Sequence, residues 1–186
     1  MSEARYLLAI ANGENQRVEF KERLDRRKPH KICEEVAAFA SSGGGTIFVG
    51  VKDDKSIVGI EDAEIAHVVS KVENTIAEKV SPAPQWSAGM AKLQGKTVLV
   101  IVVEASEHPI HYYDGRPYHR VGTASRPASS SEVTSRHMQF AIRDEFRRIA
   151  DTATASYIYG QGELATMDYS ELVKRLTSDF PALLSR

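Results

Sequence analysis

Hydrophobic residues recur along the chain with two spacings, and together these spacings predict a mixed fold. Between residues 63 and 80, apolar residues fall every three or four positions, which is typical of an amphipathic helix. The same spacing predicts shorter helices at about 4–11 and 31–41. Val18 and Phe20 alternate with charged residues, which indicates a half-buried strand. We therefore expect an α+β protein in which helices pack on a mixed β-sheet.

Turn residues divide the remaining apolar runs into pairs of strands. Acidic residues and glycines between two β-branched runs are typical of hairpins. The run VLVIVV at 98–103 is apolar on both of its faces, so it is expected in the middle of the sheet. Three hairpins are predicted, and they join residues 46–51 to 57–60, 85–90 to 97–103, and 109–113 to 116–121.

Three consecutive glycines, Gly43 to Gly45, follow the predicted helix at 31–41. Glycine adopts positive φ without steric cost, so these residues are predicted to end that helix. They lack the lysine and hydroxyl of a P-loop, and the C-terminus of a helix repels phosphate. We interpret them as a structural turn.

The chain after the last hairpin is predicted to be helical. Serines at 129–131 offer N-caps for a helix that runs to about Ala150, and a further helix is predicted at about 169–178. We therefore expect a domain at residues 1–130 and a C-terminal helical extension at residues 131–186. The apolar side chains of this extension either pack back on the domain or form a homodimer, and both alternatives stay open.

Composition narrows the classes of partner. With 186 residues and a net charge of −1, the chain has no overall attraction to polyanions, so a nucleic-acid site must be a local patch. The single cysteine, Cys33, rules out an internal disulfide and is expected to be a buried thiol. The N-terminus does not resemble a signal peptide, and no apolar run reaches the roughly 18 residues of a membrane span. We expect a cytoplasmic protein with no membrane partner.

Two groups of basic residues are candidates for such a patch. Lysine and arginine bind phosphates, and aromatic side chains stack on unpaired bases. The alternative is that the first group forms a solvated loop and that the tyrosines of the second group pack in the sheet. The candidate nucleic-acid-binding residues are Lys21, Arg26, Arg27 and Lys28 in the first group, and Tyr113, Arg116, Tyr118, Arg120 and Arg126 in the second.

Three blocks of sequence resemble one family in their order along the chain. They read ENQRVEFKE, AAFASSGGGTIFVGVKDDKSIVGI and HPIHYYDGRPYHRVGTASRPAS. Together they are similar to the Schlafen/AlbA-type domain family from Glu14 to Ser130, although Ser41 stands where the family usually has asparagine. The resemblance implies a mixed α/β fold, similar to the Schlafen core, that is linked to nucleic-acid binding. Some Schlafen members cleave structured RNA with three carboxylates, and the matching positions here are Glu14, Glu19 and Asp53.

These three residues are therefore candidate catalytic residues and metal ligands. Carboxylate oxygens suit Mg²⁺ or Mn²⁺, which activate water toward a phosphodiester. Glu14 and Glu19 fall on opposite faces of one straight strand, so they converge only if the chain bends near Gly13. The alternative is that Glu19 forms a cross-strand ion pair and that Asp53 only shapes its turn. No organic cofactor is expected.

These observations favour a nucleic-acid-binding module, for RNA or DNA, that uses the basic and aromatic hairpin. A metal-dependent endoribonuclease that acts on structured RNA through the three carboxylates is the first alternative. A non-catalytic oligomerisation or interaction protein is the second.

Overall fold

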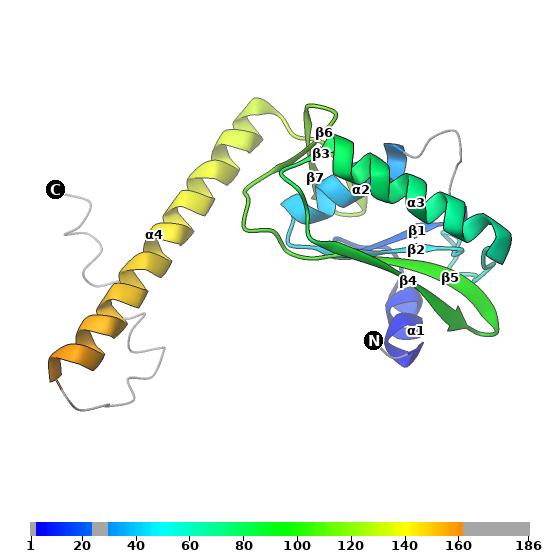
Figure 1. Ribbon diagram of the computed structural model, residues 1–186, viewed down its shortest axis with the longest axis horizontal. Coiled ribbons are helices and arrows are strands. Elements are labelled where there is room, and N and C mark those ends of the chain that lie inside the picture. Colours follow the sequence, from blue (N-terminus) through cyan, green and yellow to red (C-terminus); the bar gives the residue numbers. More distant parts are fainter. Residues whose placement is uncertain (1–2, 24–29, 162–186) are drawn as a thin grey trace. The chain divides into compact units, whose positions relative to one another are not determined.

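The computed structural model describes residues 3–23 and 30–161, and Figure 1 shows how the elements follow one another. The candidate residues Arg26, Arg27 and Lys28 and the helix expected at 169–178 lie outside these residues. The elements are α1 (Glu3–Asn12), β1 (Val18–Lys21), α2 (His30–Ser41), β2 (Gly45–Val49), α3 (Asp62–Lys79), β3 (Val80–Ser81), β4 (Trp86–Leu93), β5 (Lys96–Val103), β6 (His111–Tyr113), β7 (Arg116–Val121), β8 (Ala124–Pro127) and α4 (Ser130–Gln161).

The described strands form two sheets. The first has the order β1-β2-β5-β4 and the second has the order β3-β6-β7-β8. β1 and β2 run parallel, with Val18 opposite Thr46, and the other neighbouring pairs are antiparallel. β5 lies between β2 and β4 with residues 98–101 buried, which confirms the central position predicted for this run. The fold is α+β with a mixed sheet, as the spacing predicted.

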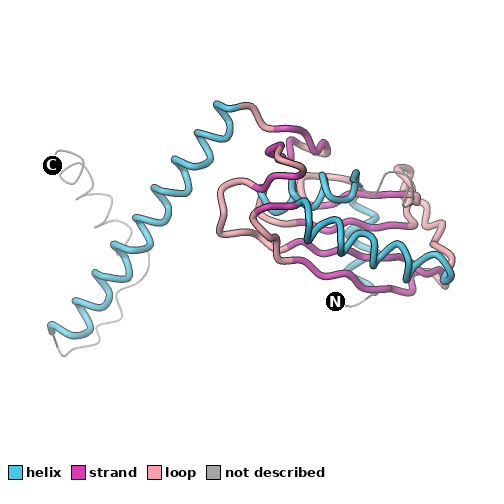
Figure 2. The backbone as a smooth tube through the Cα atoms, turned by 45° about the horizontal axis from the view of Figure 1, so that its top comes forward, coloured by secondary structure: helices cyan, strands magenta, loops and turns pink. Residues whose placement is uncertain are grey.

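Helix α2 forms the centre of the larger core, where it contacts strands of both sheets. Its Val36 and Phe39 are completely buried, together with Ile47 and Val49 of β2. Helix α3 covers the same face of the first sheet, across whose strands it runs in Figure 2. The other face of this sheet packs on α1, and Phe48 of β2 points to that side. The alternation along β2 therefore supplies side chains to two separate cores.

The glycine turn after α2 has the structural role that the sequence predicts. Helix α2 ends at Ser41, and the amides of Ser42 and Gly44 both donate to the Phe39 carbonyl, at 2.9 and 2.8 Å. Gly43 and Gly44 have φ of +87° and +86°, a region that only glycine adopts easily. These residues turn the chain out of the helix and into β2.

The segment after β2 differs from the prediction. Residues 57–60 do not form a strand, and only Val51 and Ile57 make an isolated bridge. Gly50 and Gly59 both have positive φ, and a Cβ on Gly50 would lie 3.0 Å from the backbone of Gly59. The prediction of a regular hairpin here was wrong, because two backbones that cross this closely do not form a ladder.

After β7, the described part of the chain contains one strand that was not predicted and a helix that is longer than expected. β8 (ASRP) has no apolar alternation and ends in proline, so its sequence does not predict a strand, yet it pairs with β7. Helix α4 begins within the predicted serine run and continues to Gln161, beyond the expected end at Ala150. The chain divides into two compact units, residues 1–138 and 139–186, with the boundary inside α4.

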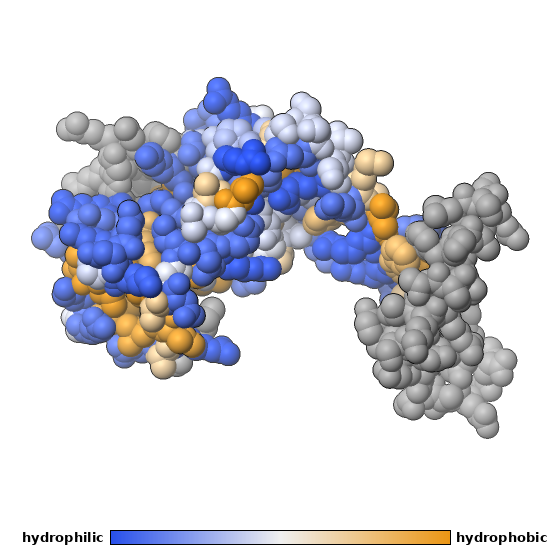
Figure 3. All heavy atoms as spheres, turned by 180° about the vertical axis from the view of Figure 1, so that it is seen from behind, coloured by the Kyte–Doolittle hydropathy of each residue, from blue (hydrophilic) through white to orange (hydrophobic). Residues whose placement is uncertain are grey.

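The surface of the first unit is polar for the most part. Figure 3 shows hydrophilic residues over most of its visible face, with smaller hydrophobic areas between them. Leu8 and Met90 are among the large hydrophobic side chains that are exposed, at 63% and 44%. No described helix is long and apolar enough to cross a membrane.

Candidate functional site

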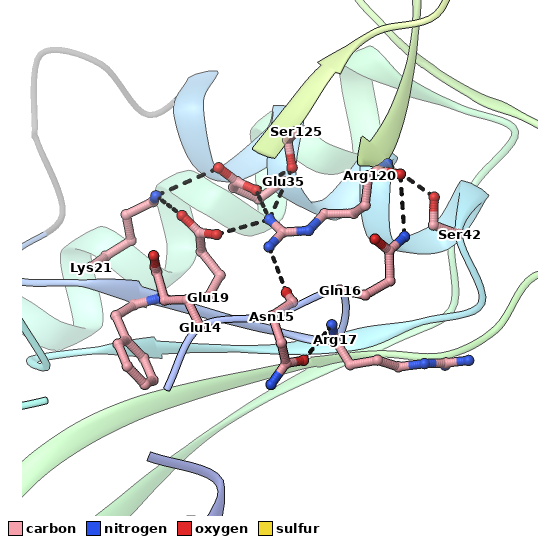
Figure 4. A network of polar contacts seen from close by, with 11 residues as sticks. Glu14, Asn15, Gln16, Arg17, Glu19, Lys21, Glu35, Ser42, Arg120 and Ser125 are labelled. Carbon is pink, nitrogen blue, oxygen red and sulfur yellow. Dashed lines mark hydrogen bonds and ion pairs between the residues drawn. The ribbon is translucent and has the colours of Figure 1, made fainter. Parts of the chain in front are cut away.

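The side chain of Arg120 is fully buried (0% exposed), and polar contacts surround it in Figure 4. Its Nη1 donates to the carboxylates of Glu19 and Glu35 at 2.8 Å each. Its Nη2 donates to the Asn15 carbonyl at 2.9 Å, and the guanidinium lies 4.4 Å from the centre of the Phe39 ring. A charge at this depth is stable only when oppositely charged and hydrogen-bonding groups match it.

The groups around Arg120 come from both sheets and from α2. Glu19 and Lys21 are two positions apart on β1, so they share a face, and the Lys21 ammonium contacts Glu19 and lies 3.5 Å from Glu35. Ser125 of β8 donates to Glu35 of α2. This arrangement ties β1 of the first sheet to β7 and β8 of the second through α2. We call these five residues the buried ion network: Glu19, Lys21, Glu35, Arg120 and Ser125.

The charges of the buried ion network balance, since two carboxylates face one arginine and one lysine. Burial raises the pKa of Glu35, and the charge of Glu19 raises it further. Burial lowers the pKa of Lys21, but the two glutamates outweigh this effect and the pKa is raised overall. The network therefore has no excess negative charge to attract a divalent cation.

The three carboxylates of the family match lie in three different settings. Glu14 accepts a hydrogen bond from the Phe20 amide at 2.8 Å, Glu19 belongs to the buried ion network, and Asp53 is exposed in a turn. The chain does bend before β1, where Gly13 has φ of +81°. Among residues 3–23 and 30–161, no group of three or more His, Cys, Asp or Glu side chains is placed to hold a metal ion.

The candidate nucleic-acid-binding residues of the second group differ in solvent exposure: some are buried and others are exposed. Tyr113 and Tyr118 are 9% and 6% exposed, and the Tyr118 hydroxyl donates to Glu34 at 3.1 Å. Burial is the main cause that raises the pKa of Tyr113 to about 12. These tyrosines therefore pack in the sheet, as the alternative interpretation of the sequence holds. Arg120 lies inside the protein with them. Arg116 and Arg126 are exposed.

Register explains which side chains of the second sheet reach solvent. Arg120 lies opposite Ser125, Tyr118 opposite His111 and Tyr113 opposite Arg116, so these pairs share the face that meets α2. The other face, which we call the outer face, carries three further cross-strand pairs of β6, β7 and β8. These are Tyr112 with Pro117, His119 with Arg126 and Val121 with Ala124.

The start of α4 closes over part of the outer face. Arg136 donates to the Ser41 carbonyl and lies 3.2 Å from the Nδ1 atom of His119. Glu132 pairs with Arg126 at 2.6 Å. Burial lowers the pKa of His119, while the charge of Glu132 opposes this shift. These contacts connect residues 130–138 to both α2 and β7.

Sequence reasoning missed Glu35 and Ser125 as partners of Arg120. A signal for Glu35 is present, because it lies three positions after Ile32 and four before Phe39, on the apolar face of α2. A carboxylate at such a position requires a buried cation. Nothing in the sequence indicates Ser125, because its role depends on the pairing of β8.

A family model described as Schlafen, AlbA_2 matches residues 14–129. The chain belongs to this family. The match includes every residue of the buried ion network and ends one residue before α4. Membership of the Schlafen AlbA_2 family associates the chain with a nucleic-acid-related role.

Two relatives match this chain over part of their own length. The chain is 29% identical over 91 residues to an uncharacterized ATP-binding protein of Ureaplasma parvum, a match that covers 48% of this chain and 26% of that protein. The crystal structure of the DIP2311 protein from Corynebacterium diphtheriae matches 70% of this chain and 26% of that one, with 27% identity and a TM-score of 0.51. This chain thus spans about a quarter of the length of both relatives.

A third match is more remote. The solution structure of the N-terminal domain of a RecG-related protein from Nitrosomonas europaea covers 56% of this chain and 74% of that one, with 19% identity and a TM-score of 0.40.

Proposed function

We propose that this Schlafen AlbA_2 domain binds nucleic acid through cations on and beside the outer face of its second sheet. The family match over residues 14–129 carries the proposal. The net charge of −1 gives no general attraction, so binding depends on a few well-placed side chains.

The exposed arginines supply the phosphate contacts in this proposal. Arg126 lies on the outer face with a side chain that is 46% exposed, and Arg116 is exposed at the β6–β7 turn. Tyr112, half-buried on the same face as Arg126, provides an aromatic surface on which a base can stack. Arg120 has a positioning role, because it holds β7 against β1 and α2 while its guanidinium stays inside.

The proposal does not extend to cleavage. A metal-dependent nuclease needs a site with spare negative charge, and Glu19 is already paired with Arg120 and Lys21. Cleavage with Mg²⁺ or Mn²⁺ through Glu14, Glu19 and Asp53 stays a prediction.

The test removes the two exposed charges and measures binding. Arg116→Gln combined with Arg126→Gln should weaken the binding of single-stranded RNA or DNA by about tenfold or more. It should also flatten the dependence of log K on log salt by about one per lost phosphate contact. Glutamine avoids a new carboxylate beside Glu132. Fluorescence anisotropy over a salt series measures both quantities.

A matched control has the same change in net charge at a distant place. Arg5→Gln with Lys55→Gln alters exposed residues on α1 and on the turn after β2, and binding should not change. Equal affinity of the wild type and the Arg116/Arg126 variant would contradict the proposal, as would a wild type that binds neither nucleic acid.

A further inference from the structure

Strand β4 is the last strand of the first sheet in the described part of the chain, and its outer edge has no neighbouring strand. It is eight residues long, and Ser87, Ala88, Gly89 and Met90 are exposed. Figure 1 shows β4 beside β5, forming the border of the sheet.

The ladder between β4 and β5 shows which peptide groups of β4 point outward. The Glu104 amide donates to the Gln85 carbonyl at 2.9 Å, so residue 85 faces β5. Because direction alternates along a strand, the odd-numbered residues of β4 also face β5. The outward peptide groups belong to the even-numbered residues, which are Trp86, Ala88, Met90 and Lys92.

This edge lacks the features that usually prevent strand pairing. Native sheets protect an edge with proline, bulges or central lysines. β4 contains no proline, and its register with β5 is continuous from Trp86 to Leu93. Its one charged residue, Lys92, lies near the end and donates to the Thr97 hydroxyl at 2.6 Å. The edge is therefore suited to accept another strand.

We propose that β4 pairs in antiparallel fashion with β4 of a second copy of this chain, with the twofold axis at Gly89. The four outward residues are symmetric about position 89. With Ala88 opposite Met90 of the second copy, and Trp86 opposite Lys92, every outward peptide group of both strands finds a partner. Any other twofold register of these strands leaves outward groups unpaired at the ends. This interface is independent of the proposed nucleic-acid surface.

The side chains of β4 fit the same register. A groove of about 280 Å³ lies along β4, and its lining includes Ala88, Val69 of α3 and Leu99 of β5. Met90 is on this face because it pairs with Leu99, and it is 44% exposed. In the dimer, Met90 of each copy stands opposite the small Ala88 of the other and enters its groove.

Charge also agrees with this arrangement. Lys92 of one copy lies opposite Trp86 of the other, where an ammonium and an indole face attract each other. No like-charged residues oppose each other, since Lys92 is the only charged residue of β4.

A single cysteine at the axis tests the register. Position 89 has no atom within 4 Å of a built Cβ, so Gly89→Cys leaves the fold intact. Residues on the axis form a non-hydrogen-bonded pair with Cα atoms about 4.5 Å apart, which allows a disulfide. Mild oxidation of Gly89→Cys should therefore give a covalent dimer on a non-reducing gel. Cys33 is buried in the protein, so it does not compete.

Ser87→Cys is the matched control on the same strand. Its side chain leaves the same side of β4 and is also exposed, but the two copies of residue 87 lie about 14 Å apart in this register. It should give no covalent dimer. Equal cross-linking of the two variants, or none of Gly89→Cys, would overturn the proposal.

A proline tests the outward hydrogen bonds. The amide of Ala88 points away from β5, so Ala88→Pro removes an interface donor without breaking the β4–β5 ladder. Sedimentation should give a dimer for the wild type and a monomer for Ala88→Pro, and the circular dichroism spectra of the two proteins should match. A monomeric wild type would reject this interface. A variant that stays dimeric would also reject it and would place the self-association elsewhere. If Ala88→Pro fails to fold, the two cysteine variants decide.

Discussion

Arg120 determines how the two sheets of this domain are held together. Moving an arginine out of water costs several kcal/mol, and only close partners offset this cost. Here Glu19, Glu35 and the Asn15 carbonyl all lie within 2.9 Å of its two terminal nitrogens. The ring of Phe39 adds a cation–π contact. The residue that sequence reasoning assigned to ligand binding is thus the centre of a structural ion network.

Replacement of Arg120 by methionine should destabilise the fold strongly. It leaves Glu19 and Glu35 buried beside each other with only Lys21 to neutralise them, and we expect the free energy of unfolding to fall by about 3–5 kcal/mol. Urea denaturation followed by circular dichroism measures this change. Arg116→Met, at an exposed position, is the control and should stay within about 0.5 kcal/mol of the wild type. A loss from Arg120→Met no larger than that of the control would show that the network is not a source of stability.

At the scale of elements, the close approach of α2 and β2 explains the run of glycines. A Cβ on Gly45 would lie 2.2 Å from the ring of Phe39, and a Cβ on Gly44 would lie 2.6 Å from the Val103 carbonyl. Neither space admits a methyl group. The turn is therefore glycine-rich because a helix, its following strand and β5 meet there. The helix α2, which carries both Glu35 and Phe39, depends on this turn.

Gly45→Ala should consequently destabilise the domain by about 1–3 kcal/mol, the usual cost of forcing an extra carbon into a packed core. Gly89→Ala is the matched control, because it adds the same methyl group to a strand of the same sheet where nothing lies within 4 Å. Thermal unfolding of the two variants measures the difference. Equal midpoints would mean that Phe39 moves aside without cost.

At the scale of the molecule, the first compact unit contains both hydrophobic cores. Their members lie between Tyr6 and Tyr118, well inside residues 1–138. The first turns of α4 complete this unit, since Arg136 contacts Ser41 and His119. No described residue after Met138 is a member of either core.

A fragment of residues 1–138 should therefore fold cooperatively by itself. Its circular dichroism and thermal unfolding should show one transition, close to that of the full chain. A fragment that ends at Ala128 removes Arg136 and Glu132 and should melt at a lower temperature, because His119 and the end of α2 lose their cover. Failure of the longer fragment to fold would mean that the second unit supplies essential contacts.

Sequence alone was sufficient for features that depend on local periodicity. Three features could be predicted in this way: the helical spacing of α3, the run of β5 that is apolar on both faces, and the glycines that end α2. The backbone sets the periods of helices and strands, so such local patterns are enough to predict these elements. The three ordered blocks around Glu14, Gly43 and Arg120 likewise indicated the family before the fold was known.

Tertiary structure alone decided which residues face inward. Along β7, Tyr118 and Arg120 have one parity and His119 has the other, and none of them is a plain apolar residue. Alternation therefore does not reveal which face α2 covers. The packing of α2 places Arg120 and Tyr118 inside and leaves Arg126 of the adjacent β8 on the outer face. Likewise, Arg120 pairs with Glu19 and Glu35, which lie 101 and 85 positions away along the chain. Only the folded chain brings such residues together, and their charges then determine what the site can do.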